Sequence, residues 1–245
     1  MKTVAVIQAR IASTRLAAKA MLPLAGKPMI VHVIERALAI KGVCSVILAT
    51  GISAANDPLE KIAADCGVVL FRGSEDNVLE RFYLAVKNRG FDYIIRITGD
   101  NPLTDHVSAS AALHYACDNK FDHCSVSGIP LGTGIEIVSM SALERAYRES
   151  SNPYHFEHVT PYIKEHPGFF STGKYSPGME NPFPELRLTV DTPEDFDLMG
   201  KIYKALYRDR PILLTEVITF LMANPDLVNI NSHVEQRPMT HSSNV

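Results

Sequence analysis

The sequence predicts an α/β fold built on a doubly wound, mainly parallel, Rossmann-like sheet. In the first half of the chain, short continuous runs of β-branched and apolar residues alternate with segments whose apolar positions recur at helical spacing. Prolines stand where the first turn of a helix tolerates them, and glycines stand where helices stop. This alternation is typical of sheets covered by helices on both faces, which bind ligands at the carboxyl ends of their strands.

The first half of the chain is expected to hold four strands and three helices. Each strand is a continuous apolar run, which suits a sheet that is buried on both faces. The predicted strands cover residues 3–9, 45–50, 68–71 and 93–98. The predicted helices cover residues 28–40, 58–66 and 77–88.

The pattern changes between residues 121 and 184, where glycines, prolines and aromatic residues lie among shorter elements. We interpret this stretch as a small insert subdomain. Its predicted elements are a strand over residues 134–139 and helices over residues 142–149 and 157–165.

The strand pattern returns at residues 186–190 and is followed by a helix that begins at Pro193. Thr192 is a good N-cap for this helix, and Asp195 can complete a capping box. We therefore expect one domain over residues 1–225. A polar tail over residues 226–245 is expected to fray at its end.

Composition excludes several classes of protein. The chain has 245 residues, of which 46% are hydrophobic and 21% are charged, so it is neither disordered, collagen-like nor a disulfide scaffold. A formal net charge of −3 argues against bulk attraction to nucleic acid or to an anionic membrane. The absence of a signal peptide, a membrane-spanning stretch and any CxxC pair among the four cysteines leads us to expect a cytoplasmic protein with reduced thiols.

Charge is unevenly distributed along the chain. The first 34 residues carry five basic side chains and no acidic one, since the first carboxylate is Glu35. The basic residues are Lys2, Arg10, Arg15, Lys19 and Lys27. This asymmetry indicates a small, strongly anionic ligand held near the N-terminus, with a solvated basic surface as the alternative.

The loop after the first predicted strand is the strongest candidate for that ligand site. Arg10, Arg15 and Lys19 recur along it, and Ser13 and Thr14 add small hydrogen-bond donors. Such a loop can surround a polyphosphate with side chains and backbone amides together. It contains neither the GxxxxGK[ST] pattern of a P-loop nor the GxGxxG pattern of a dinucleotide site.

Two aspartates follow predicted strands. Asp100 comes after the strand at 93–98, and Asp191 comes after the strand at 186–190. Carboxylates at the carboxyl ends of two strands can converge on one Mg²⁺, which binds one or two carboxylates together with phosphate oxygens. The alternatives are a turn aspartate at position 100 and a helix-entry residue at position 191.

The sequence also resembles a known family in several ordered blocks. These are residues 8–10 with 13–16 and Lys19, then residues 71–82, 96–103, 157–162 and 187–195. With these blocks the chain, from Met1 to about Tyr207, resembles the spore-coat polysaccharide biosynthesis cytidylyltransferases. Those enzymes are relatives of the synthetases of CMP-activated ketosugar acids, within the nucleotide-diphospho-sugar transferase superfamily.

The resemblance implies a reaction and a set of partners. The reaction is transfer of CMP from CTP to an anionic, sugar-derived acceptor, with release of pyrophosphate, in cell-surface polysaccharide or glycoconjugate biosynthesis. Mg²⁺ is the implied cofactor, and a homodimer formed through the insert at 121–184 is the implied assembly. The insert is also expected to contribute to the acceptor site.

The resemblance likewise implies roles for individual residues. Three are expected to be catalytic: Arg10, Lys19 and Asp100. The nucleotide is expected to contact Gln8, Ala9, Arg10, Ser13, Arg15, Lys19, Gly73, Ser74, Thr98 and Asp100. The acceptor is expected to contact Asn101, Glu136, Glu157, His158 and Arg187. The metal is expected to bind Asp100 and Asp191.

Two departures from the family pattern leave alternatives open. Family members usually have Pro-Gly where this chain has Ala17-Ala18, and alanine at position 18 would be strained in a loop that needs a positive φ. The stretch at 130–136 lacks the aspartate that many relatives carry before the glutamate. The alternatives are a nucleotidyltransferase with another base, or with a phosphonate or phosphorylated acceptor, and a CTP-binding protein that has lost turnover.

Overall fold

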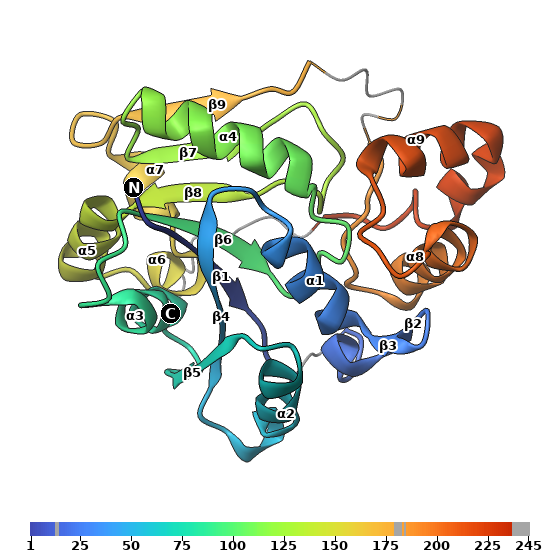
Figure 1. Ribbon diagram of the computed structural model, residues 1–245, viewed down its shortest axis with the longest axis horizontal. Coiled ribbons are helices and arrows are strands. Elements are labelled where there is room, and N and C mark those ends of the chain that lie inside the picture. The colour runs from blue at the N-terminus through green and yellow to red at the C-terminus, as the bar shows by residue number, and fades with distance from the viewer. Residues whose placement is uncertain (13–14, 179–182, 184, 237–245) are drawn as a thin grey trace.

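A computed structural model describes residues 1–12, 15–178, 183 and 185–236 of the chain. Its main feature is a seven-stranded sheet with the strand order β5-β4-β1-β6-β8-β7-β9 (Figure 1). The strands are β1 (Thr3–Gln8), β4 (Val43–Gly51), β5 (Val69–Gly73), β6 (Tyr93–Thr98), β7 (His123–Val126), β8 (Glu136–Ser139) and β9 (Thr172–Tyr175). A separate hairpin joins β2 (Pro23–Leu24) to β3 (Lys27–Pro28).

The sheet is mainly parallel, as the sequence predicts. Strand β1 lies between β4 and β6 and is parallel to both, while β8 pairs antiparallel with β6 and with β7. In the register of the central strands, Gln8 lies beside Ala49 on one side and Thr98 on the other. The loops that leave β1 and β6 therefore begin at the same edge of the sheet.

Helices cover both faces of the sheet, which confirms the doubly wound architecture. On one face, Ala5 and Ile7 of β1 belong to a core built with α1 (Met29–Leu38), α2 (Pro58–Asp65) and α4 (His106–Asp118). On the other face, Val4 and Val6 belong to a core built with α3 (Val78–Val86), α5 (Met140–Glu149) and α7 (Pro161–Glu165). Figure 1 views the sheet from the side that α1 and α4 cover.

The segment 121–184 contributes β7, β8 and β9, which extend the main sheet beyond β6. The prediction of one helix over residues 157–165 is wrong, because α6 (Pro153–His158) and α7 are separate. Val159, between them, has a φ of 72°, and Pro161 lacks the N–H that a continuous helix would use.

A third core joins the end of the chain to the segment at 186–190. The prediction of a strand there is wrong, because within the described part of the chain this segment forms just one isolated bridge, between Arg187 and Leu131. Leu186, Leu188 and Val190 are buried against α8 (Pro193–Leu206) and α9 (Leu214–Ala223) instead of within the sheet. Arg187, which lies between Leu186 and Leu188 in this extended segment, is also buried.

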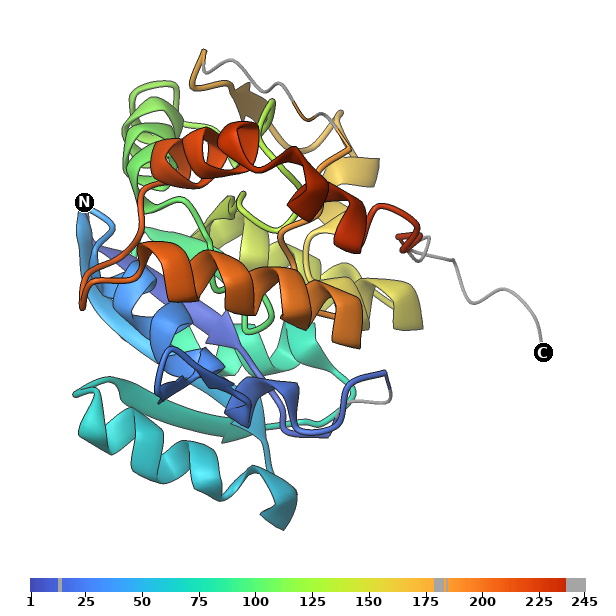
Figure 2. The ribbon, with the colours of Figure 1, turned by 90° about the vertical axis from the view of Figure 1, so that its right-hand side faces the viewer.

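The chain after α9 folds back instead of fraying at once. A 3-10 helix, η3 (Pro225–Ile230), packs against α8 and α9 (Figure 2). Asn231, which follows η3, is 2% exposed. The predicted polar tail therefore begins with an ordered stretch over residues 226–236, and residues 237–245 lie outside the described part. Among the described residues, no helix combines the length and apolarity needed to cross a membrane.

Candidate active site

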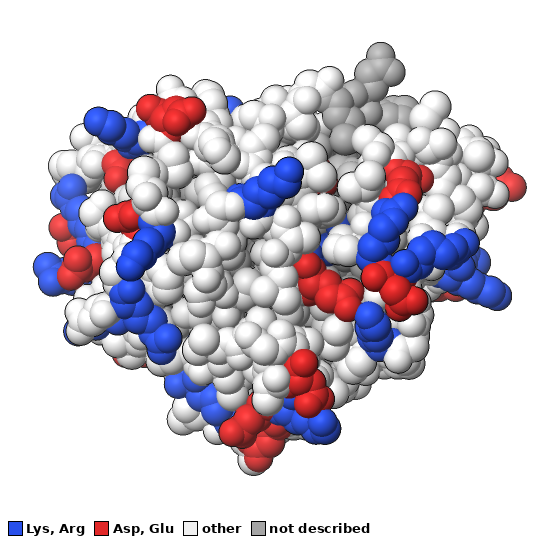
Figure 3. All heavy atoms as spheres, in the orientation of Figure 1, with Lys and Arg blue, Asp and Glu red and all other residues white. Residues whose placement is uncertain are grey.

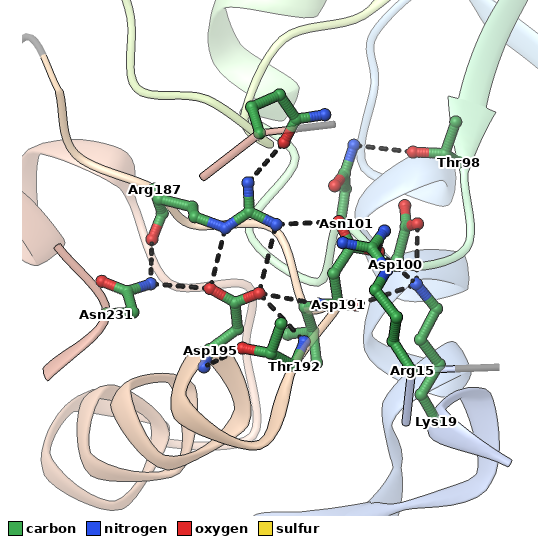
Figure 4. A network of polar contacts seen from close by, with 12 residues as sticks. Arg15, Lys19, Thr98, Asp100, Asn101, Arg187, Asp191, Thr192, Asp195 and Asn231 are labelled. Atoms are coloured by element: carbon green, nitrogen blue, oxygen red, sulfur yellow. Dashed lines mark hydrogen bonds and ion pairs between the residues drawn. The ribbon is translucent and has the colours of Figure 1, made fainter. Parts of the chain in front are cut away.

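Three segments that are far apart in the chain meet at the carboxyl end of the sheet. Strand β6 ends at Thr98, and Asp100 lies in the turn just beyond it. Lys19 begins the 3-10 helix η1 (Lys19–Met21) in the loop after β1, and Asp191 lies just before α8. The N–H of Val190 donates to the carbonyl oxygen of Asp100 at 2.9 Å, which fixes the last segment to the turn. Figure 4 shows how these side chains converge.

The Lys19 ammonium lies between the two aspartates. Its Nζ donates to Asp100 Oδ2 at 3.0 Å, to Asp191 Oδ1 at 2.8 Å and to the carbonyl oxygen of Val190 at 2.9 Å. The Lys19 side chain is only 16% exposed, so these attractions are screened less by water than those of a surface ion pair. Lys19 is therefore part of a site and not of a solvated basic surface.

The face shown in Figure 3 carries no broad basic patch. Lys and Arg side chains are mixed with Asp and Glu around its rim, and its centre is largely uncharged.

The Asp191 carboxylate forms ion pairs with three cationic side chains, Lys19, Arg15 and Arg187. The Arg15 guanidinium is 2.9 Å from Asp191 Oδ1, and the Arg187 guanidinium donates to Asp191 Oδ2 at 2.8 Å. Burial alone would raise the pKa of Asp191. The hydrogen bond from Lys19 and the charges of Lys19, Arg15 and Arg187 outweigh burial and hold the pKa of this carboxyl below its usual range. Asp191 is therefore an anion that is buried and strongly compensated.

The donors present suit a metal ion that binds together with a phosphate ligand. Asp100 and Asp191 already share one cationic group, the Lys19 ammonium. Among the described residues, no cluster of three or more His, Cys, Asp or Glu side chains could hold a metal by itself. Mg²⁺ commonly binds one or two carboxylates and completes its shell with phosphate oxygens and water. The pair of aspartates fits such a shared site.

The backbone that presents Lys19 is strained. Ala18 has φ 50° and ψ 32°, in the left-handed region, and its carbonyl oxygen accepts from the N–H of Met21 at 2.8 Å. An alanine in this region costs roughly 1 kcal/mol relative to glycine. The loop thus has at position 18 the positive φ for which the family's glycine is suited, although the residue is alanine.

Several residues that are expected to contact the nucleotide lie at the ends of the paired strands β1 and β6. Ala9 is buried, Arg10 is exposed, and Gln8 is half-buried with an Oε1 atom that has no partner. Thr98 Oγ1 accepts from Asn101 Nδ2 at 2.7 Å, while Asn101 Oδ1 is buried without a partner. Unpaired buried acceptors are costly, so these two oxygens mark a place where a ligand can donate hydrogen bonds. Ser13 lies outside the described residues.

Gly73 and Ser74 occupy the junction between β5 and α3, as expected. Gly73 is the last residue of β5. Ser74 Oγ accepts from the N–H of Asn77 at 3.0 Å, and its carbonyl oxygen accepts from Arg81 at 2.7 Å. In this structure Ser74 therefore stabilises the start of α3, and it does not contact the cluster around Lys19.

Glu136 lies at the centre of a second polar cluster, on the sheet face that α3 and α5 cover. Its carboxylate accepts from Arg96 at 2.9 Å, from Lys164 at 3.0 Å and from Thr160 Oγ1 at 3.0 Å, and it lies 3.2 Å from His123 Nε2. Burial would raise the pKa of Glu136, but His123, Arg96 and Lys164 together hold the pKa far below its usual range.

Of the remaining residues expected at the acceptor site, two lie near the Glu136 cluster and Arg187 lies beside Asp191. Glu157 is exposed and His158 is half-buried near the Glu136 cluster. Burial lowers the pKa of His158, and the charges of Arg96 and Lys164 lower it further, although Glu157 and Glu136 oppose them. Arg187 is 4% exposed. Its guanidinium contacts Asp191, Asp195 and Gln236, and its expected contact with the acceptor stays a prediction.

Comparison with known proteins assigns the chain to a family. The family model described as Cytidylyltransferase matches residues 4–223. The chain belongs to the cytidylyltransferase family. It is 31% identical over 226 residues to the spore coat polysaccharide biosynthesis protein SpsF of Bacillus subtilis, covering 90% of this chain and 94% of that protein.

Two further relatives support the assignment of this cytidylyltransferase. The 3-deoxy-manno-octulosonate cytidylyltransferase of Yersinia pseudotuberculosis is 33% identical over 174 residues, which cover 67% of this chain and 66% of that protein. The structure of a cytidylyltransferase from Leptospira borgpetersenii superposes with a TM-score of 0.86 at 29% identity, covering 93% of this chain and 97% of that one.

Sequence reasoning missed some residues of this cytidylyltransferase site. Arg96 lies within a block that carries the resemblance, yet no role was assigned to it. Asn231 and Gln236 contact the Arg187 cluster from the end of the chain. No local pattern marks these two residues, because their contacts span 36 and 49 positions of the sequence.

Proposed function

We propose that this cytidylyltransferase transfers CMP from CTP to an anionic, sugar-derived acceptor and releases pyrophosphate, in the biosynthesis of a cell-surface polysaccharide or glycoconjugate. The observation that carries the proposal is the convergence of Lys19, Asp100 and Asp191 at the carboxyl end of the sheet. A lysine and two carboxylates from three loops make a site for a metal-bound triphosphate. Family membership supports CTP as the donor.

The chemistry is displacement at the α-phosphorus. The acceptor oxygen attacks in line, and Arg10, Arg15 and Lys19 stabilise the negative charge that develops on the phosphate oxygens. Asp100 and Asp191 would hold Mg²⁺, which when bound polarises the phosphates and neutralises their charge. Positioning and electrostatics therefore supply most of the catalysis, and a covalent intermediate is not needed.

The acceptor is assigned to the sheet face that carries the Glu136 cluster. Every second residue of a strand points to the same face of the sheet. This face therefore carries Gln8 together with Val6 of β1, and Arg96 and Thr98 together with Ile94 of β6. The cations Arg96 and Lys164 favour an acidic acceptor. His158 has a lowered pKa, so it is neutral near pH 7 and can take a proton from a hydroxyl acceptor. Residues 121–184, which bear most of this cluster, are proposed as the acceptor-binding and dimer-forming part.

A pyrophosphate-release assay tests the proposal. The enzyme is given CTP and Mg²⁺ with a panel of sugar acids, sugar phosphates and phosphonates, and then ATP, GTP or UTP in place of CTP. We expect release with CTP and a sugar acid. Turnover restricted to a phosphonate or a phosphorylated acceptor would change the acceptor class. Equal turnover with all four nucleotides would contradict the cytidylyl assignment.

The strained Ala18 favours one second candidate, a protein that binds CTP without turning it over. A thermal-shift titration with the four nucleotides distinguishes the two. Under the proposed function, CTP gives the largest shift, the shift grows with Mg²⁺, and pyrophosphate is released with an acceptor. A CTP-specific shift without release from any acceptor would support the binding protein instead.

A further inference from the structure

Asp195 links Asp191 to Arg187 by accepting hydrogen bonds from both residues. Its side chain is 0% exposed and accepts from Arg187 Nε at 2.9 Å on Oδ1. Its second oxygen, Oδ2, accepts from an Arg187 terminal nitrogen at 3.2 Å and from the N–H groups of Asp191 at 2.9 Å and Thr192 at 3.1 Å. Asp195 thus forms the predicted capping box and also fixes the backbone of Asp191.

Arg187 transmits this arrangement to the Asp191 carboxylate. While its Nε is paired with Asp195, the Arg187 guanidinium donates to Asp191 Oδ2 at 2.8 Å. The other oxygen, Oδ1, is the one that contacts Arg15 and Lys19. Arg187 therefore sets the rotation of the Asp191 carboxylate, with one oxygen directed inward and the other toward Arg15 and Lys19 of the loop over residues 9–22, the phosphate loop of the proposed function (Figure 4).

The end of the chain fixes Arg187 and Asp195 in turn. Asn231 is 2% exposed, and its Nδ2 donates to Asp195 Oδ1 at 2.9 Å and to the carbonyl oxygen of Arg187 at 3.0 Å. Gln236 Oε1 accepts from the remaining terminal nitrogen of the Arg187 guanidinium. Two amide side chains from residues 225–236 therefore contact the pair that orients Asp191.

We infer that Asn231 is a positioning residue for nucleotidyl transfer, acting through Asp195 and Arg187 on the Asp191 carboxylate. The inference rests on the proposed function, because Asp191 is there a ligand of the metal that accompanies CTP. It assigns the segment after α9 to the active site, although this segment holds none of the residues that would touch the phosphates. Partners of this kind orient metal-binding carboxylates, and their loss commonly costs about 10-fold to 100-fold in metal affinity or rate.

The test compares Asn231→Leu, which keeps most of the side-chain volume and removes both donors, with the wild-type chain. Mn²⁺ binding in the presence of CTP is followed by electron paramagnetic resonance, and turnover is measured as pyrophosphate release. We expect the Mn²⁺ concentration at half-saturation to rise about 10-fold and kcat to fall about 10-fold. Asn231→Ser retains a hydroxyl donor. Its Mn²⁺ concentration at half-saturation and its kcat are therefore expected to lie between those of Asn231→Leu and those of the wild-type chain.

Asn229→Leu is the matched control, because Asn229 is an exposed residue of the same segment. Asn229→Leu should leave the Mn²⁺ concentration at half-saturation and kcat within about twofold of the wild-type values, well below the tenfold changes expected of a positioning partner.

If Asn231→Leu does not fold, as judged by its thermal unfolding, Gln236→Leu at the exposed end of the same cluster is tested instead and should weaken Mn²⁺ binding. Unchanged Mn²⁺ affinity and kcat in every folded variant at positions 231 and 236 would overturn the inference. A wild-type chain that fails to bind Mn²⁺ with CTP would instead overturn the proposed function.

Discussion

Lys19 and Asp191 are 172 positions apart in the sequence and form an ion pair of 2.8 Å. The same ammonium reaches Asp100 at 3.0 Å, so one lysine offsets the repulsion between two aspartates. The Lys19 ammonium lies between the two carboxylates and compensates the charge of both. This relationship makes the phosphate loop, the turn after β6 and the start of α8 dependent on one another.

Lys19→Ala should affect turnover much more than folding. The Lys19 side chain belongs to none of the three hydrophobic cores, so its removal leaves no cavity in them. It deletes charge-assisted contacts worth roughly 1.5–3 kcal/mol in total, or about one to two decades in kcat/KM. Steady-state kinetics with CTP measures the loss, and Lys2→Ala, an exposed lysine of the same acid-free stretch, is the control that should retain full rate.

Asp100→Asn and Asp191→Asn should both abolish turnover, because each removes an anionic ligand of the proposed metal. They should differ in stability. The Asp100 side chain is 27% exposed, whereas the Asp191 side chain is 9% exposed and is paired with three cations. Urea denaturation should show a loss of about 1–3 kcal/mol for Asp191→Asn and less for Asp100→Asn. Near-wild-type rates for either variant would return that aspartate to a structural role.

Ala18→Gly should stabilise the chain, because glycine adopts the left-handed conformation of position 18 without strain. The expected gain is up to about 1 kcal/mol, read as a rise in Tm. Ala17→Gly is the matched control: Ala17 is not among the described residues with positive φ, so glycine there only adds freedom to the unfolded chain. If the strain also slows the enzyme, Ala18→Gly and the double change Ala17→Pro with Ala18→Gly will raise kcat/KM. A fall in both Tm and kcat/KM would show that the loop favours alanine.

His158 should make the protein less stable in mild acid. Burial and the neighbouring charges of Arg96 and Lys164 lower its pKa in the folded state. As the pH falls through the ordinary value near 6.5, the unfolded chain therefore takes up a proton that the folded chain resists, and stability decreases. His158→Gln removes this contribution, so the drop in Tm between about pH 7.5 and about pH 5 should be smaller than in the wild type. An unchanged pH dependence would mean that His158 titrates normally in the folded state.

The parts of the fold that could be predicted from the sequence are those with strong local patterns. The strand at 93–98 matches β6 at both ends, because a continuous β-branched run is buried on both faces. The helix α4 was missed, since its serines and alanines give only a weak difference between buried and exposed sides. The segment at 186–190 has the residues of a strand, but its partners are α8 and α9, which no local pattern reveals.

The candidate site, too, could be predicted from the sequence only in part. The rule that strand ends share one edge of a sheet predicts that Asp100, after β6, lies near the loop that follows β1. Asp191 joins them although residues 186–190 do not form a strand. Sequence spacing also does not show that Asp195 and Asp191 share the guanidinium of Arg187. Contacts made by single polar side chains across long separations depend on tertiary packing, which periodicity does not encode.

The strand order has a consequence for how the chain matures during synthesis. The four strands β5, β4, β1 and β6 all come from residues 3–98, so they can pair while the rest is still being translated. The residues that surround Asp191 extend to Gln236, far beyond these four strands in the sequence. A nascent chain can therefore form these four strands, with Lys19 in the loop after β1, while the surroundings of Asp191 are still incomplete. Those surroundings are completed only after Gln236 has been added, when the late, long-range contacts close.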